Sequence, residues 1–156
     1  MKTRHKAREI ALQTLYAMDF NGQLDAGHIP QAFSGVDEKE YESMEDEVKL
    51  FARYLVNGTI ENLEEIDQLI GQYSLNRPVE RIDVVDRNIL RLSVFCFLYD
   101  KEIHPNIVID EAVKLSQEFS TDVTYKFING ILDTMSKKLP LAFSKRGSGK
   151  EEEVQK

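Results

Sequence analysis

The longest apolar stretch of the chain is Val84–Asp100. Within it, nine of the eleven residues in Ile89–Tyr99 are apolar or aromatic, and only Arg91 and Ser93 interrupt them. A helix at a protein surface has one apolar stripe, whereas a helix that is apolar on nearly all sides is covered by its neighbours. The stretch is too long for a buried strand and too short for a membrane span. It therefore predicts a buried central helix.

Apolar residues also recur at helical spacing in five other segments, at about residues 3–20, 43–57, 60–73, 105–119 and 122–138. This period of three to four residues is typical of amphipathic helices. Gly58 is expected to break or kink the chain between the second and third segments. Only four prolines and eight glycines interrupt the 156 residues. The pattern therefore predicts an all-α fold over residues 1–140, followed by a tail over 141–156 that is too poor in apolar residues to fold.

The charged residues are unevenly distributed. The net charge of −7 argues against a protein that coats nucleic acid, because lysine and arginine supply most of the attraction to phosphates. Residues 1–8 nevertheless contain no acid, residues 37–67 contain eleven acids, and residues 134–150 contain five lysines or arginines and no acid. This asymmetry favours a local basic binding edge, although solvated surface and chain ends account for any single run equally well.

Several classes of function are excluded by residues that the chain lacks. The single cysteine, Cys96, rules out a disulfide framework. The three histidines, His5, His28 and His104, are far apart, so we expect no metal site. No nucleotide-binding glycine loop or catalytic motif is present, so neither a cofactor nor an enzymatic activity is predicted. The N-terminus lacks the apolar core of a secretory signal, and the predicted location is the cytoplasm, with no membrane association.

Two stretches are more polar than core packing requires. One is the basic N-terminal run, which contains Lys2, Arg4, His5, Lys6 and Arg8. Cations beside an ordered helix can bind phosphates without reading a sequence. The other is Tyr125–Gly130, where asparagine and glycine are unusual for the middle of a helix. Aromatic rings beside cations suit single-stranded RNA, and Phe127 could be either a core residue or a stacking platform.

Three segments, together and in this order, resemble the NusB family of bacterial transcription antitermination factors. They are Arg4–Glu9 with Ala11–Tyr16, Val85–Leu92, and Lys126–Asp133. A fourth segment, Ile109–Val113, is similar to the part of the family that follows the central helix. The resemblance covers about residues 4–138. Each motif is weak by itself, but the ordered set is specific.

The resemblance implies a NusB-like fold of two packed three-helix subdomains, at about residues 1–75 and 76–140. It also implies a role without catalysis. NusB proteins bind the single-stranded boxA element of ribosomal RNA leaders together with NusE, a small-ribosomal-subunit protein. The pair helps to load an antitermination complex on RNA polymerase, and boxA RNA, NusE and this complex are therefore the expected partners.

Site residues follow from the resemblance position by position. The residues expected to bind RNA are Lys2, Arg4, His5, Lys6, Arg8, Lys126, Phe127 and Asn129, with Phe127 as the candidate base-stacking ring. The residues expected near NusE or RNA are Tyr16, Glu80, Asp86 and Arg87. The chain departs from the family pattern at a few positions, which are His5 for arginine, Arg77 for an aromatic residue, Ser120 for glycine and Val123 for an acid.

Two other interpretations remain open at this point. A helical protein-interaction scaffold that never contacts RNA would also fit the helical pattern, although the basic N-terminus argues against it. NusB-like domains also occur at the front of ribosomal RNA cytosine methyltransferases, but this chain ends without a catalytic domain. A homodimer that hides the RNA surface is a further possibility.

Overall fold

The computed structural model describes residues 2–34, 44–75, 77–121 and 123–143, and all the regular secondary structure in these ranges is helical. The α-helices are α1 (Lys2–Phe20), α2 (Ile29–Ser34), α4 (Asp46–Glu61), α5 (Leu63–Tyr73), α6 (Val84–Tyr99), α7 (Pro105–Phe119) and α8 (Thr124–Lys138), with the short 3-10 helices η1 (Ala26–His28) and η2 (Val79–Arg81). The predicted all-α fold is confirmed. None of these helices is long and apolar enough to cross a membrane.

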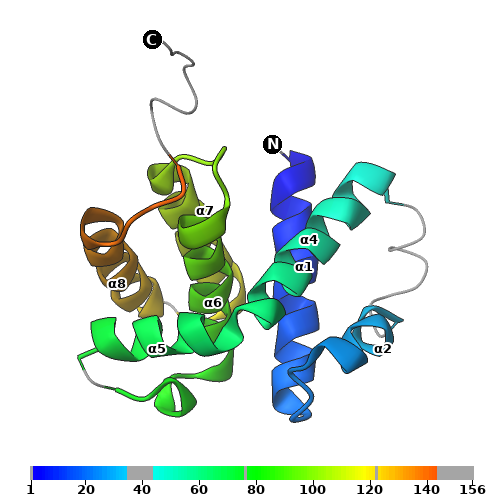
Figure 1. The fold of residues 1–156 in the computed structure, drawn as a ribbon, viewed down its shortest axis with the longest axis horizontal. Coiled ribbons are helices and arrows are strands. Elements are labelled where there is room, and N and C mark those ends of the chain that lie inside the picture. The colour runs from blue at the N-terminus through cyan, green and yellow to red at the C-terminus, as the bar shows by residue number, and fades with distance from the viewer. Residues whose placement is uncertain (1, 35–43, 76, 122, 144–156) are drawn as a thin grey trace, which may run out of the picture.

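Helix α6 is the centre of the fold, as the apolar stretch predicts. It contacts α1, α4, α5, α7 and α8 (Figure 1). Every residue from Asn88 to Phe97 is buried. The helix begins after Asp83, whose side chain accepts a hydrogen bond from the Val85 N–H. Such a cap pairs a backbone donor that has no partner within the helix.

The other helices form two groups around α6. Helices α1, α2 and α4 pack together on one side, and α7 and α8 pack together on the other (Figure 1). Helix α5 crosses below them and contacts α6, with smaller contacts to α4 and α8. The helices therefore pack as two groups around one core, while the subdomain boundary near residue 75 stays a prediction.

The chain after α8 returns to the central helix. The Ala142 N–H donates to the Phe97 carbonyl at 2.8 Å, and the Phe143 ring lies 5.0 Å from the His104 ring, centre to centre. Leu141 packs against the core. The folded chain thus continues to Phe143, slightly beyond the predicted end at residue 140, and the remainder of the predicted tail, residues 144–156, lies outside the described residues.

A network of charged side chains joins α1, α5 and α6 inside the protein. Asp19, near the end of α1, accepts hydrogen bonds from Arg87 at 2.7 and 2.8 Å, from Asn88 at 2.9 Å and from Arg91 at 2.9 Å. Arg91 also donates to Asp67 of α5 at 2.8 and 3.0 Å. The Arg91 side chain is only 5% exposed. Arg91, one of the two polar residues in the apolar stretch, therefore links α6 to both α1 and α5.

Gly58 does not break a helix, contrary to the sequence prediction. It lies inside α4, which continues to Glu61. A Cβ atom at this position would lie 2.2 Å from Cε1 and Cζ of Phe95 on α6. Glycine is therefore needed here because the two helices approach closely, and the chain changes direction only at Asn62, between α4 and α5.

The Gly58→Ala variant is expected to be less stable than the wild type by about 1–3 kcal/mol, because the buried Phe95 ring would have to move. Gly71 in α5 provides a matched control, since nothing lies within 4 Å of a Cβ built there. Gly71→Ala should be neutral or more stable by up to about 1 kcal/mol, as alanine favours helices. Urea denaturation followed by circular dichroism measures both changes. Equal effects in the two variants would contradict the packing explanation.

Candidate nucleic-acid interface

The basic run predicted to bind RNA forms the first two turns of α1. Arg4 and Arg8 turn toward α4, where their guanidinium carbons lie 4.3 and 5.3 Å from the centre of the Phe51 ring. Arg4 is exposed, whereas only 8% of Arg8 is exposed. Lys6 forms an ion pair with a carboxylate less than one turn further along α1, and the Lys2 side chain lies outside the described residues. Arg4 and Lys6 are therefore the accessible cations of this run.

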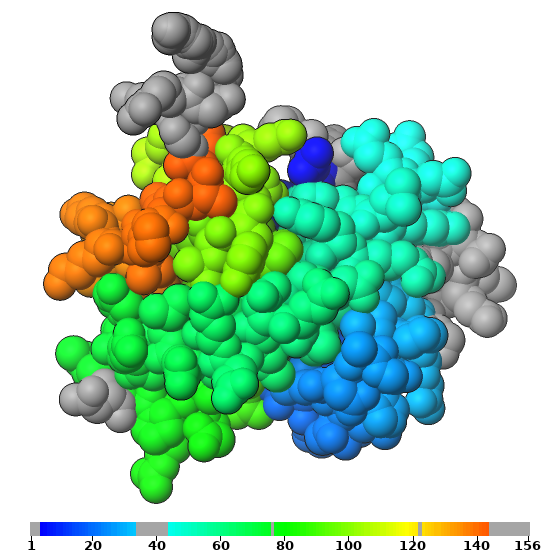
Figure 2. Space-filling model, in the orientation of Figure 1, coloured from blue at the N-terminus to red at the C-terminus, as the bar shows by residue number. Residues whose placement is uncertain are grey.

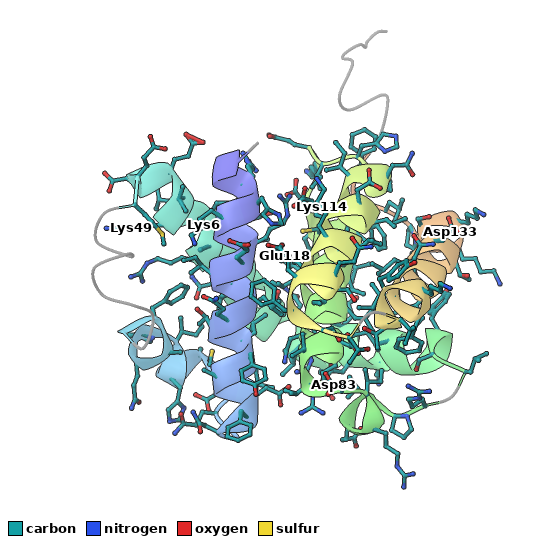
Figure 3. The ribbon with its side chains drawn as sticks, turned by 180° about the vertical axis from the view of Figure 1, so that it is seen from behind. Lys6, Lys49, Asp83, Lys114, Glu118 and Asp133 are labelled. Atoms are coloured by element: carbon teal, nitrogen blue, oxygen red, sulfur yellow. The ribbon has the colours of Figure 1, made fainter. Side chains whose placement is uncertain are left out.

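His5 ties α1 to α7, where the Glu111 carboxylate also lies 3.8 Å from Arg8. Its Nδ1 lies 2.8 Å from Glu111 Oε1, and its Nε2 lies 2.8 Å from Glu118 Oε1. Figure 3 shows Glu118 beside the N-terminal part of α1. Burial lowers the pKa of His5, but the hydrogen bonds to Glu111 and Glu118 outweigh it and raise the pKa above its usual value. With Glu9 also 3.5 Å away, carboxylates offset much of the positive charge here.

We expect the His5 contacts to stabilise the fold only while His5 is protonated. Because its folded pKa is above the unfolded value of about 6.5, this stabilisation is complete below about pH 6.5 and is lost as the pH rises through the folded pKa. The difference in thermal midpoint between wild type and His5→Ala should therefore shrink between about pH 6 and pH 8. Thermal unfolding at several pH values measures it, and a constant difference would contradict this account.

Within the described ranges, a group of side chains near His5 has the spacing needed to hold a metal ion. The potential ligand atoms of His5, Glu9 and Glu118 all lie within 4.8 Å of one another. Both nitrogens of the His5 ring already face carboxylates, so a protonated imidazole can supply the positive charge that these carboxylates need. The prediction that the chain uses no metal stays a prediction.

A hollow of about 540 Å³ lies between α7 and α8. It is lined by Asp110, Val113, Lys114, Tyr125, Lys126 and Asn129. Lys126 and Asn129 are exposed and lie on one side of α8, because residues three apart in a helix are neighbours. The ring of Tyr125, two ammonium groups, an amide and the carboxylate of Asp110 thus surround one opening. This combination can stack a base, pair with its phosphate and bond its edge.

Phe127, the predicted stacking ring, does not line this hollow. It is half-buried and packs against the core. The guanidinium carbon of Arg77 lies 5.0 Å from the centre of its ring, so a cation already covers one face. The RNA contact predicted for Phe127 stays a prediction, whereas Tyr125, which is also half-buried, is the ring that lines the hollow.

A chain of hydrogen bonds fixes the turn between α7 and α8, next to the hollow. Helix α8 starts at Thr124 without a side-chain cap from Val123. Instead, the Thr124 hydroxyl donates to Ser120 Oγ at 2.9 Å, and the Ser120 hydroxyl donates to Asp86 Oδ1 at 2.8 Å. Asp86 is 3% exposed, and burial raises the pKa of its carboxyl group. Asp86 therefore anchors the α7–α8 turn, and its predicted contact with a partner stays a prediction.

An apolar groove lies near the other end of α1. Tyr16 is 38% exposed and Phe20 is 72% exposed, and their rings stack with centres 6.0 Å apart. The groove has a volume of about 330 Å³ and is lined by Leu12, Gln13, Tyr16, Val85 and Phe119. Exposed apolar surface is a common feature of protein-binding sites. Tyr16 lines this groove, and its predicted contact with a partner stays a prediction.

The remaining predicted partner residues, Glu80 and Arg87, lie next to each other. An Arg87 N–H donates to the Glu80 carbonyl at 3.2 Å, and the Glu80 side chain is exposed. The hydrogen bonds to Asp19 raise the pKa of Arg87 and hold its guanidinium inside the network. Arg87 thus has a structural role in the free protein, while Glu80 remains accessible.

Sequence reasoning missed several members of these surfaces. Phe20 follows Tyr16 by four residues, and this helical spacing was a usable signal. Tyr125 was visible only as a part of its motif, because the face of α8 that it occupies depends on how α8 packs. Glu111 and Glu118 carried no local signal, since they reach His5 across more than 100 residues of sequence.

Comparisons with known proteins show similarity over most of the chain. The model of the NusB family matches residues 5–137. The transcription antitermination protein NusB of Thermodesulfovibrio yellowstonii is 37% identical over 138 residues, which are 86% of this chain and 91% of that protein. The protein of the same name from Geobacter sp. is 39% identical over 140 residues, which are 87% of this chain and 95% of that one.

Solved structures are similar over nearly the same length. The structure of T. maritima NusB has a TM-score of 0.76 and 33% identity, and the match covers 86% of this chain and 91% of that one. A crystal structure of the antitermination factors NusB and NusE in complex with dsRNA has a TM-score of 0.77 and 28% identity. The match covers 88% of this chain and 98% of that one.

Proposed function

Because the chain belongs to the NusB family, we propose that it is a transcription antitermination factor that binds boxA-type single-stranded RNA of ribosomal RNA leaders together with NusE. The pair helps to assemble the antitermination complex on RNA polymerase in the cytoplasm. The chain acts by binding and performs no catalysis. The names of its relatives and the solved complex of NusB with NusE and dsRNA support this role.

The proposed RNA surface runs from the basic start of α1 across α7 to the hollow at the start of α8. The observation that carries it is the hollow, because Tyr125, Lys126 and Asn129 supply a ring, a cation and an amide to one opening. Arg4 and Lys6 add phosphate contacts at the other end. RNA would cross α7 near Lys114, which is 62% exposed.

The carboxylates around His5 limit binding to other nucleic acids. Glu9, Glu111 and Glu118 repel a phosphate chain that does not follow the basic positions, and the net charge of −7 repels it at long range. Affinity of the chain alone should therefore be modest. A second protein that supplies further cations would complete the site, and NusE is the proposed partner.

The groove at Tyr16 is the proposed binding surface for NusE. Phe20, Val85 and Phe119 offer apolar contacts there, and the exposed carboxylate of Glu80 offers a charged one at the same end of the molecule. The groove and the hollow lie on different parts of the surface, joined by α7, so RNA and protein can bind at once.

A helical scaffold that binds protein without touching RNA is the second candidate. The carboxylates around His5 favour it, because they weaken the basic edge. Titrating the chain with leader RNA alone, with NusE alone and with both, at stated salt, separates the two functions. RNA that fails to bind even in the presence of NusE would exclude the first. Sedimentation of the free chain reports whether a homodimer forms.

Lys126→Ala is expected to weaken RNA binding and to lower the salt slope of the affinity by about one, because one phosphate contact is lost. Fluorescence anisotropy with labelled leader RNA at several salt concentrations measures the slope. Lys137→Ala is the matched control, since Lys137 lies at the far end of the same helix and is 72% exposed. An unchanged slope for Lys126→Ala, or an equal change in both variants, would remove the hollow from the RNA surface.

A further inference from the structure

Gly130 lies in the middle of α8, at a position where the fold does not require a glycine. A Cβ atom built there meets nothing within 4 Å, and the residue is exposed. This differs from Gly58, where the Phe95 ring leaves no room for a side chain. Alanine forms helices better than glycine does, whereas glycine lets a ligand approach the backbone closely. The bare surface of α8 at Gly130 is therefore suited to contact a ligand.

Lys126 and Phe127 are the neighbours of Gly130 on the surface of α8, because residues three and four positions apart lie on one side of a helix. The same spacing places Gly130 between them. Lys126 is exposed and also lines the hollow between α7 and α8. Asp133 is one turn further along α8, but Lys137 pairs with it at 3.1 Å. The bare surface thus continues from the hollow, and its nearest charged neighbour on α8 is a cation.

Arg77 covers the Phe127 ring on the other side of Gly130. It follows α5, and Figure 2 shows α5 (green) directly below α8 (orange). The Arg77 guanidinium carbon lies 5.0 Å from the centre of the Phe127 ring, and the residue is exposed. Its backbone is fixed by the buried Ser74, whose hydroxyl donates to the Arg77 carbonyl at 2.8 Å and whose carbonyl accepts from the Arg77 N–H at 3.1 Å. A guanidinium is therefore held in place at the surface.

We propose that single-stranded RNA continues from the hollow across Gly130, and that a base stacks on the guanidinium of Arg77. The proposal rests on the proposed function, because it extends the same RNA surface to the far side of α8. Unstacked bases lie on guanidinium planes as they do on aromatic rings. In this arrangement Tyr125 holds one base, Lys126 pairs with a phosphate, and Arg77 holds a further base, while the sugar–phosphate backbone passes over Gly130.

Charge and shape favour RNA over a protein at this surface. The side chains on its two sides, Lys126 and Arg77, are cations, which attract phosphates. Gly130 has no side chain, so a docking helix or strand would gain little apolar contact there. RNA instead needs a smooth path for its backbone and flat groups for its bases, and both are present.

The half-buried ring of Phe127 then has a positioning role. It packs against the core and supports the guanidinium of Arg77, which lies between the ring and the solvent. A base that stacked directly on Phe127 would have to displace Arg77. The two arrangements therefore predict opposite effects of removing Arg77.

Gly130→Ala tests the path across α8. The variant should have an equal or higher thermal midpoint, because alanine favours helices. Its affinity for leader RNA, measured by fluorescence anisotropy with NusE present, should nevertheless fall about 5- to 10-fold, as expected when one stacking contact is lost. Gly71→Ala is the matched control, since a Cβ on that residue of α5 also meets nothing within 4 Å, and it should keep the full RNA affinity.

Unchanged RNA affinity in Gly130→Ala, or an equal loss in Gly71→Ala, would overturn the proposal. Weaker binding of Gly130→Ala to NusE in the absence of RNA would also overturn it, because the bare surface would then belong to the protein partner.

Arg77→Ala and Arg77→Lys test the stacking platform. We expect both variants to lose affinity for leader RNA about 10-fold, because lysine keeps the positive charge but has no flat group on which a base can lie. The salt slope of binding should stay unchanged in Arg77→Lys. Full affinity in Arg77→Lys would reduce Arg77 to a phosphate contact and overturn the stacking. Equal or higher affinity in Arg77→Ala would show that the base lies on Phe127 itself.

The same titrations separate this proposal from the proposed function. If the wild-type chain binds no leader RNA even with NusE present, both are wrong. If the wild type binds RNA, and Lys126→Ala weakens binding while Gly130→Ala and Arg77→Ala do not, the RNA surface ends at the hollow and only the extension is wrong.

Discussion

Replacing Asp19 by alanine is expected to destabilise the fold by about 3–5 kcal/mol, the usual cost of removing one partner of a buried ion pair. The Asp19 side chain is 8% exposed and receives hydrogen bonds from Arg87, Asn88 and Arg91. Without it, the nearly buried guanidinium of Arg91 loses one of its two carboxylate partners and keeps Asp67 and the amide oxygen of Asn88. Urea denaturation measures the loss.

Asp133→Ala is the matched control for this effect. Asp133 pairs with Lys137 at 3.1 Å, but the two side chains are 50% and 72% exposed, and such surface pairs contribute less than about 1 kcal/mol. Similar losses for Asp19→Ala and Asp133→Ala would show that burial of the network has no energetic consequence.

The same network predicts sensitivity to acid. Burial acts to raise the pKa of Asp19, but the hydrogen bonds from Arg87 and Asn88 outweigh it and lower the pKa below its usual value. Its contribution to stability is therefore present above the unfolded pKa of about 3.9 and is lost as the pH falls through the folded pKa. The stability difference between wild type and Asp19→Ala should accordingly fall below about pH 4.

Tyr125→Ala is expected to reduce the affinity for leader RNA about 10- to 100-fold. Stacking of a base on an aromatic side chain contributes about 1–3 kcal/mol, and about 1.4 kcal/mol corresponds to a factor of ten. Tyr125 lines the hollow together with Lys126 and Asn129, so a base stacked on its ring keeps its phosphate within reach of a cation. Fluorescence anisotropy of the chain with NusE present measures the change.

Two further variants complete this measurement. Phe127→Ala tests the competing candidate for the stacking ring, and Phe20→Ala is the control. Phe127 is the ring that the family resemblance indicates, but it is half-buried under Arg77. Phe20 is an exposed ring away from the hollow, so its removal should not affect RNA binding by the chain alone. If Phe127→Ala keeps its helicity and loses RNA affinity while Tyr125→Ala does not, the stacking ring is Phe127, as the sequence predicts.

The sequence predicts those structural features that depend on residues close together in the chain. The buried central helix follows from an apolar run, and its ends were placed to within one residue. The function of Gly58 could not be predicted in this way. Glycine commonly ends helices, and only the approach of Phe95, from a distant part of the chain, shows that this one permits close packing.

In the candidate site, too, local features could be predicted and contacts between distant residues could not. The motifs located Arg4, Lys126 and Asn129 on accessible surface. They could not show that Asp86 is buried beneath Ser120, because a charged residue at the start of a helix is usually exposed. They also could not show that His5 faces carboxylates of α7, since no local pattern links positions more than 100 residues apart.

Arg91, a polar residue within the apolar stretch, has a consequence for how the partners are aligned. A helix covered by apolar contacts alone can slide or rotate at little cost, because such contacts have no direction. Arg91 must meet both Asp19 and Asp67, and only one rotation and one height of α6 allow this. We infer that the network fixes the angle between the groove at Tyr16 and the hollow at Lys126, so that a bound protein and a bound RNA always meet in the same orientation.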